Sequence, residues 1–148
     1  MSLPIFRGVA PSLAELNPIL RDKIRSGVDL YKRELRPILR DSLVYHHTPL
    51  TQFLNQTPWV VLEYASPDRS RAVVTLFRTS NFEDPVYRFV PRGLDASGTY
   101  KVTFQNRSET VELPGIQLMQ DGIPVRLETA GTSEMLLFKN VPANAKNR

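Results

Sequence analysis

The stretch WVVLEYASPDRSRAVVTLFR (59–78) decides the class of fold, because it holds two short apolar runs on either side of a turn signal. WVVLEY (59–64) and RAVVTLFR (71–78) are rich in the β-branched and aromatic residues that strands favour. SPDRS (66–70) between them is typical of a turn. Because both runs are almost continuously apolar, we predict that they form central strands of a sheet.

Further short runs of the same kind follow along the chain. They are VYRFV (86–90), TYKVTF (99–104), TVEL (110–113), VRLE (125–128) and MLLFK (135–139). In TYKVTF the apolar and polar residues alternate, as in a strand with one wet side. Short strands without long helices between them predict an antiparallel β-sandwich of about seven to eight strands with Greek-key-like connections. PGIQLMQDG (114–122) is the exception, and it predicts one short helical turn ended by Gly122.

The residues before this β region have a helical period. From Ser12 to Arg40 the apolar positions are spaced by three or four residues, and they predict one amphipathic helix: Leu16, Leu20, Ile24, Val28, Tyr31, Leu35 and Ile38. Ser12 with Glu15 has the spacing of a capping box, but Asn17 followed by Pro18 is the start that we favour.

The stretch YKRELRPILRDSLVYHH (31–47) is a candidate joint between the helix and the strands. Pro37 should break or kink the helix near Arg36, because proline has no amide hydrogen and crowds the preceding turn. Gly27 in mid-helix suggests close approach of another element. We therefore expect an N-terminal segment and helix over residues 1–42 and a sandwich domain over residues 43–148.

Composition excludes several functional classes. The net charge of +4 comes from dispersed residues rather than a basic stripe, which argues against a nucleic-acid partner. No run approaches the ~20 apolar residues that span a bilayer, so no membrane partner is expected. The N-terminus MSLPIFRGVAP has no signal-peptide pattern, which favours a cytoplasmic location. The chain has no cysteine, which excludes disulfides, thiolate metal sites and cysteine nucleophiles.

The only histidines, His46 and His47, are weak candidates for a metal site. Adjacent side chains on an extended chain point to opposite faces, so the two rings should not converge on one ion. The aspartates of the turns, Asp68, Asp84 and Asp95, suit local hydrogen bonding to the backbone. Without any complete motif for catalysis or cofactor binding, we predict no catalytic residue, no metal ligand and no cofactor, and we leave ligand-binding residues unassigned.

Aromatic residues of the β runs offer one alternative, a sugar-stacking platform. The residues concerned are Trp59, Tyr64, Phe77, Tyr87 and Phe89. Because they lie inside predicted strands, we expect them to pack in the core instead.

Three pieces of the chain together resemble melibiase-type α-galactosidases. YKRELRPILRDSLVYHHTP (31–49) is similar to the end of their last barrel helix and the exit from it. RAVVTLFR (71–78) is similar to a strand ending in Phe-Arg. The region 87–139, with its Gly-Leu-Asp turn and its Gly-x-x-Leu-Met-x-x-Gly turn, resembles their C-terminal β-domain. The resemblance covers roughly residues 17 to 139.

The resemblance implies a non-catalytic accessory domain of a glycoside hydrolase. The catalytic aspartates of such enzymes lie in a (β/α)8 barrel of ~250 residues, and no part of this sequence matches those motifs. We expect a chain that is inactive alone and that braces the catalytic barrel of a parent enzyme active in carbohydrate metabolism. The alternatives are a carbohydrate-binding sandwich module and a protein interaction domain that forms a homo-oligomer through its helix.

Overall fold

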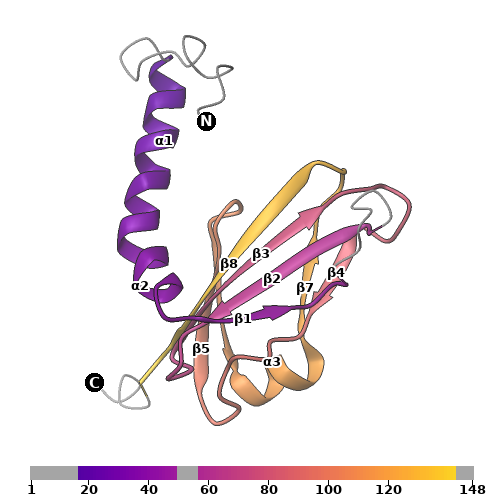
Figure 1. Cartoon of the computed structure of the whole chain (residues 1–148). Helices are drawn as coiled ribbons and strands as arrows, with labels where there is room; N and C mark the ends of the chain where they lie inside the picture. The colour runs from indigo at the N-terminus through magenta and orange to yellow at the C-terminus, as the bar shows by residue number, and fades with distance from the viewer. Residues whose placement is uncertain (1–16, 50–56, 143–148) are drawn as a thin grey trace, which may run out of the picture. The chain divides into compact units, whose positions relative to one another are not determined.

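The computed structural model describes residues 17–49 and 57–142. The chain divides into two compact units, one ending at Pro37 and one beginning at Ile38. The elements appear in Figure 1 and run in the order α1 (Pro18–Leu30), η2 (Tyr31–Leu35), α2 (Arg36–Leu39), β1 (Leu43–His46), β2 (Trp59–Ala65), β3 (Arg71–Arg78), β4 (Val86–Phe89), β5 (Thr99–Phe104), β6 (Glu109–Pro114), α3 (Gly115–Asp121), β7 (Ile123–Arg126) and β8 (Thr132–Asn140).

Helix α1 begins as the sequence predicts. The Asn17 side chain accepts a hydrogen bond from the Ile19 amide at 2.9 Å, and Pro18 occupies the first turn, where no amide hydrogen is needed. The rival start at Ser12 and Glu15 lies outside the described residues.

The predicted break near Arg36 is replaced by a π-helical turn. Residues 31–35 form the wider turn η2, in which the Arg36 amide donates to the Tyr31 carbonyl five residues back. Helical geometry then continues through Pro37 to Leu39. Because proline crowds the carbonyl four residues before it and cannot donate, a locally wider turn relieves the conflict without ending the helix.

The prediction that another element closely approaches Gly27 is wrong for the residues that the structure describes. A Cβ placed on Gly27 would have no neighbour within 4 Å. Of the predicted apolar stripe, Leu20, Ile24, Val28 and Tyr31 are 37–48% exposed, whereas Leu35 is half-buried and Ile38 is buried. An exposed stripe of this kind is unusual for a helix that is stable by itself, since packing supplies most helical stability.

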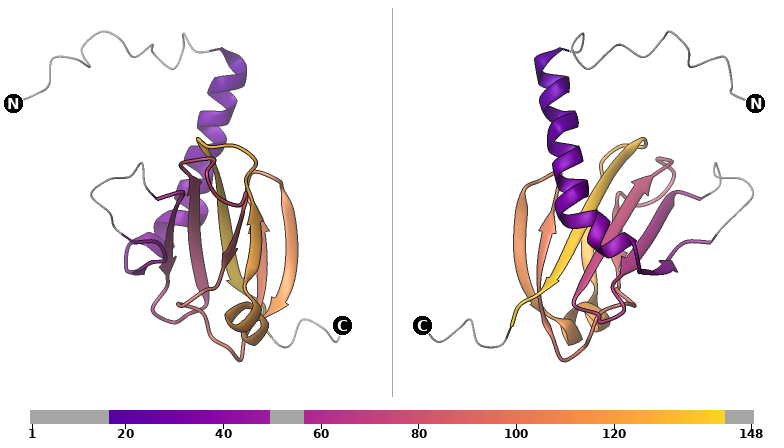
Figure 2. Two further views of the ribbon diagram at one scale, coloured as in Figure 1. Left: turned by 90° about the vertical axis from the view of Figure 1, so that its right-hand side faces the viewer. Right: turned by 60° about the vertical axis from the view of Figure 1, so that its left-hand side comes forward.

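The second unit is an antiparallel β-sandwich of two unequal layers. Strands of the larger layer lie in the order β1-β2-β3-β8-β5-β6, and β4 pairs with β7 in the smaller one (Figure 2). Strand β8 lies between β3 and β5, a long-range connection of the Greek-key kind. Each predicted run is a strand in the structure, with β7 two residues earlier than predicted. Strand β3 is central, whereas β2 lies one place from the edge.

The core lies between the two layers. It is built from the inward residues of β2, β3, β5 and β8, together with Phe89, Leu94, Leu118, Ile123 and Val125. The alternation predicted for β5 is confirmed, because Tyr100, Val102 and Phe104 are buried and Lys101 is exposed. Helix α3 follows β6, buries Leu118, and ends at Gly122, whose φ of 69° favours glycine.

Candidate functional site

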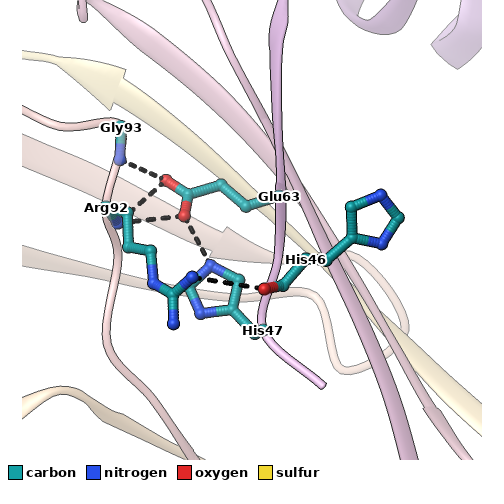
Figure 3. Close-up of polar contacts among 5 residues, drawn as sticks. All are labelled: His46, His47, Glu63, Arg92 and Gly93. Atoms are coloured by element: carbon teal, nitrogen blue, oxygen red, sulfur yellow. Dashed lines mark hydrogen bonds and ion pairs between the residues drawn. The ribbon is translucent and has the colours of Figure 1, made fainter. Parts of the chain in front are cut away.

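Glu63 is a charged residue on the inner face of β2, and it is completely buried. Its carboxylate accepts hydrogen bonds from the backbone amides of Arg92 at 2.9 Å and Gly93 at 2.8 Å. The same carboxylate lies 2.7 Å from His47 Nε2 (Figure 3). A carboxylate without partners would be costly in a protein interior, and these contacts compensate its loss of water.

The two histidines have different surroundings. The His47 side chain is buried, bonds Glu63 and packs edge-on against Phe89 at a centroid distance of 4.8 Å. His46 is exposed, and its ring points away from that of His47 (Figure 3). Its carbonyl accepts a hydrogen bond from the Arg92 guanidinium at 3.2 Å. The pair therefore joins the exit of β1 to β2 and to the loop after β4, and the rings do not converge.

The Glu63 carboxylate explains why the Gly-Leu-Asp turn begins with a glycine. A Cβ on Gly93 would lie 2.2 Å from the Ala65 Cβ and 3.1 Å from Glu63 Oε1. Only glycine lets the backbone amide come this close to the carboxylate. Two residues on, the Asp95 amide bonds the Tyr100 hydroxyl, which itself donates to the Arg69 carbonyl.

Arg78 is a second buried charged residue, and it binds two loops of the sandwich. Arg78 at the end of β3 is 4% exposed and donates to the carbonyls of Leu127, Glu128 and Glu83 at 2.6–2.8 Å. Its Nε has no hydrogen-bond partner among the described residues. The Phe-Arg ending of RAVVTLFR thus fixes the loops before β4 and after β7.

The three turn aspartates bond backbone amides, as predicted. Asp68 accepts from Ser70, Asp84 from Val86 and Asp95 from Ser97. Hydrogen bonds from the Ser66 hydroxyl and then from Ser70 lower the pKa of Asp68 to about 2. The pKa of Asp95 is lowered by its bonds from Ser97. These groups are local turn stabilisers.

Most of the aromatic residues pack as expected. Trp59 and Phe89 belong to the core, and Tyr87 packs against it, with its ring centroid 5.5 Å from that of Trp59. Phe77 and Tyr64 differ, because they lie on the opposite side of the large sheet. Trp59 and Tyr87 also line a pocket of about 370 Å³.

The side of the large sheet opposite the core is also apolar over β1, β2, β3 and β8. We call this surface the outer face, and its apolar residues are Val44, Val60, Leu62, Tyr64, Val73, Phe77, Met135 and Leu137. His46, Arg71, Thr75, Ser133 and Lys139 lie on the same side of these strands. Val44 and Phe77 are 48% and 44% exposed, whereas Val73 and Leu137 are buried and the other four are half-buried. The β5–β6 part of the same side is polar, with Lys101 opposite Glu112 and Thr103 opposite Thr110. The apolar part is therefore a defined patch and not a general property of the sheet.

Two kinds of site are absent from the part of the chain that the structure describes. No three histidine or acidic side chains there come together in a group that could hold a metal ion. No helix in residues 17–49 or 57–142 is long and apolar enough to cross a membrane. The predictions of no catalytic residue and no metal ligand stay predictions.

Sequence reasoning did not assign the buried charges Glu63 and Arg78. The sequence did contain one signal for Glu63. Alternate residues of a strand lie on the same face, and on β2 these are Trp59, Val61, Glu63 and Ala65. The pattern therefore places the Glu63 carboxylate among core residues. Its partners could not be read from the sequence, since they lie 16 to 30 positions away.

The described residues of the second unit thus form an unequal two-layer sandwich whose inner face is covered. Residues 59–138 match the model of the glycosyl hydrolase family 36 C-terminal domain, and the chain belongs to this family. A search of curated proteins finds no match.

Solved structures of several α-galactosidases have a similar fold. The GH36 α-galactosidase AgaA from Geobacillus stearothermophilus shares 22% identity over 86% of this chain, with a TM-score of 0.69. The α-galactosidase from Lactobacillus brevis shares 17% over 88%, with a TM-score of 0.70. The galactosidase domain of the α-galactosidase-sucrose kinase AgaSK shares 18% over 86%, with a TM-score of 0.67. The chain spans only 17–18% of the length of these proteins.

Proposed function

We propose that this chain is a non-catalytic accessory domain that braces the catalytic barrel of an α-galactosidase-like glycoside hydrolase, and that it is inactive alone. The observation that carries the proposal is the apolar outer face. An antiparallel sheet in contact with water normally has one polar side, whereas a sheet that is apolar on both sides is covered on both. The inner side is covered by β4, β7 and α3. We therefore assign a protein partner to the outer face.

Cross-strand pairing places several apolar residues of the outer face side by side. Val60 lies opposite Phe77, Tyr64 lies opposite Val73, and Val73 lies opposite Leu137. Such pairs stabilise a sheet, and they also form a flat surface on which apolar helices pack. The exposed members of this face, Val44 and Phe77, are large apolar residues, and apolar residues exposed together on one face favour a protein interface.

Helix α1 supports the same partner independently. Its apolar residues Ile19, Leu20, Ile24 and Val28 are exposed among the residues that the structure describes, as is Tyr31 at the start of η2. A helix of a barrel packs on the strands inside it and on its neighbours. We therefore assign α1 to the edge of that barrel, and we assign to the second unit the role of supporting the barrel.

The bracing proposal is tested by reading the coding sequence and then measuring binding. The coding sequence upstream of this chain should encode an in-frame barrel with two catalytic aspartates. That barrel, produced as a separate polypeptide, should bind the chain, and Phe77→Lys should weaken binding at least tenfold. Thr103→Lys on the polar part of the same sheet is the matched control. The absence of a barrel, or equal binding by both variants, would contradict the proposal.

The second claim, inactivity of the chain alone, has its own test. We expect no turnover of an aryl α-galactoside by the purified chain. Turnover that disappears when one of its own carboxylates is replaced would overturn this part of the proposal.

A further inference from the structure

The pocket beside β4 shares no lining residue with the outer face or with Glu63 and its hydrogen-bond partners. It is lined by residues of two regions: Thr48, Pro49, Thr57, Pro58 and Trp59 from the first, and Glu83, Asp84, Val86, Tyr87 and Arg88 from the second. Its volume of about 370 Å³ lies in the lower part of the range for small-molecule sites.

The acidic wall of this pocket is held in place by hydrogen bonds. The buried Arg78 guanidinium binds the Glu83 carbonyl at 2.8 Å, and Asp84 accepts from the Val86 amide at 2.8 Å. The Leu127 amide donates to the Pro85 carbonyl at 2.9 Å. Contacts of this kind preorganise a wall, which lowers the ordering cost that binding must overcome.

Two acidic side chains of this wall have carboxylate oxygens without a hydrogen-bond partner among the described residues. The Glu83 carboxylate has no hydrogen-bond or ion-pair partner among the described residues, and the second oxygen of Asp84 accepts no hydrogen bond from them. Phe82, next to Glu83 in the chain, is 96% exposed. Tyr87 is partly buried against Trp59, so it offers a fixed aromatic surface.

These groups select a chemical class of ligand. A sugar ring has an apolar C–H face that packs on aromatic rings and hydroxyl groups that donate to carboxylates. The two carboxylates disfavour an anion. The Arg88 guanidinium in the lining, fixed by its 2.7 Å bond to the Asp121 carbonyl, disfavours a cation.

We propose that this pocket binds one neutral pyranose ring, with Glu83 and Asp84 accepting its hydroxyl hydrogens and Tyr87 contacting its apolar face. Phe82 contacts the next residue of a longer saccharide. This binding site does not depend on the bracing of a barrel, and its test measures binding directly, so either proposal can fail alone.

The sole tryptophan of the chain, Trp59, provides the probe. Methyl α-D-galactoside and methyl α-D-glucoside are titrated into the chain while the indole N–H signal of Trp59 is followed by NMR. We expect a saturating shift with a dissociation constant on the order of 1 mM for at least one glycoside. The absence of any shift up to roughly 20 mM with both glycosides overturns the proposal.

Two variants and one control variant localise the binding. Glu83→Gln should weaken binding at least about tenfold, because a hydrogen bond to a charged acceptor is lost. Glu112→Gln, an exposed change on β6, should leave it unaltered. Phe82→Ala should weaken binding of a trisaccharide such as raffinose and leave the methyl glycosides unaffected. Equal affinities for Glu83→Gln and Glu112→Gln, or binding of n-butylamine but of neither glycoside, contradict the proposal.

Discussion

His47 Nε2 lies 2.7 Å from the carboxylate of Glu63, and both side chains are buried. Their contact connects the segment after β1 to β2, and the carboxylate also binds two amides of the loop after β4. The stretch 31–47 therefore ends in contacts that join the segment after β1 to β2 and to the loop after β4.

Removal of the Glu63 carboxylate should strongly destabilise the sandwich. Glu63→Ala leaves two backbone amides and His47 without their acceptor, so the free energy of unfolding should fall by about 3 to 5 kcal/mol. Urea unfolding followed by Trp59 fluorescence measures it. Glu112→Ala, which is exposed, is the control and should change it by less than about 0.5 kcal/mol. A loss below about 1 kcal/mol for Glu63→Ala would show that the joint is not stabilising.

Two glycines should respond to alanine in opposite ways. Gly93→Ala places a Cβ 2.2 Å from that of Ala65 and should destabilise the sandwich by at least about 2 kcal/mol. Gly27→Ala meets no atom within 4 Å and should favour the helix by about 1 kcal/mol, seen as higher helicity by circular dichroism. A tolerated Gly93→Ala would mean that the loop after β4 can move away from Glu63.

Arg78 should be sensitive to a change that preserves its size. Arg78→Met leaves three carbonyls without their donor and should cost about 2 to 4 kcal/mol in urea unfolding. Arg126→Met removes an exposed arginine whose guanidinium bonds Glu128, and it should cost much less than Arg78→Met. Similar losses for the two variants would argue against a role for Arg78 in fixing the loops.

Asp68 should make stability depend on pH in the acid range. Its pKa is lowered from 3.8 to about 2 in the folded chain, so its contribution is present above pH 4 and is lost as the pH falls toward 2. The effect should be below about 1 kcal/mol, because the group is exposed. Asp68→Asn should flatten this part of the stability curve measured by urea unfolding. An unchanged curve would contradict the assigned hydrogen bonds from Ser66 and Ser70.

Local patterns in the sequence predict much of this fold. The strands, the Asn17 cap and the end of α3 at Gly122 follow from short-range propensities, which the structure confirms. The π turn before Pro37 was not predicted, because the choice between breaking and widening a helix depends on small differences in local packing. The partners of Glu63 and Arg78 depend on how distant strands pair, which periodicity does not determine.

The central claim is that a catalytic barrel covers the outer face of the large sheet. The direct measurement is hydroxyl-radical labelling of Tyr64, Phe77 and Met135 in this chain alone and in the protein that contains its barrel, with the exposed Phe82 as the internal reference. We predict that the three outer-face residues are labelled in the chain alone and protected several-fold in the longer protein, while Phe82 is labelled in both. Equal labelling of Tyr64, Phe77 and Met135 in the two proteins would contradict the claim.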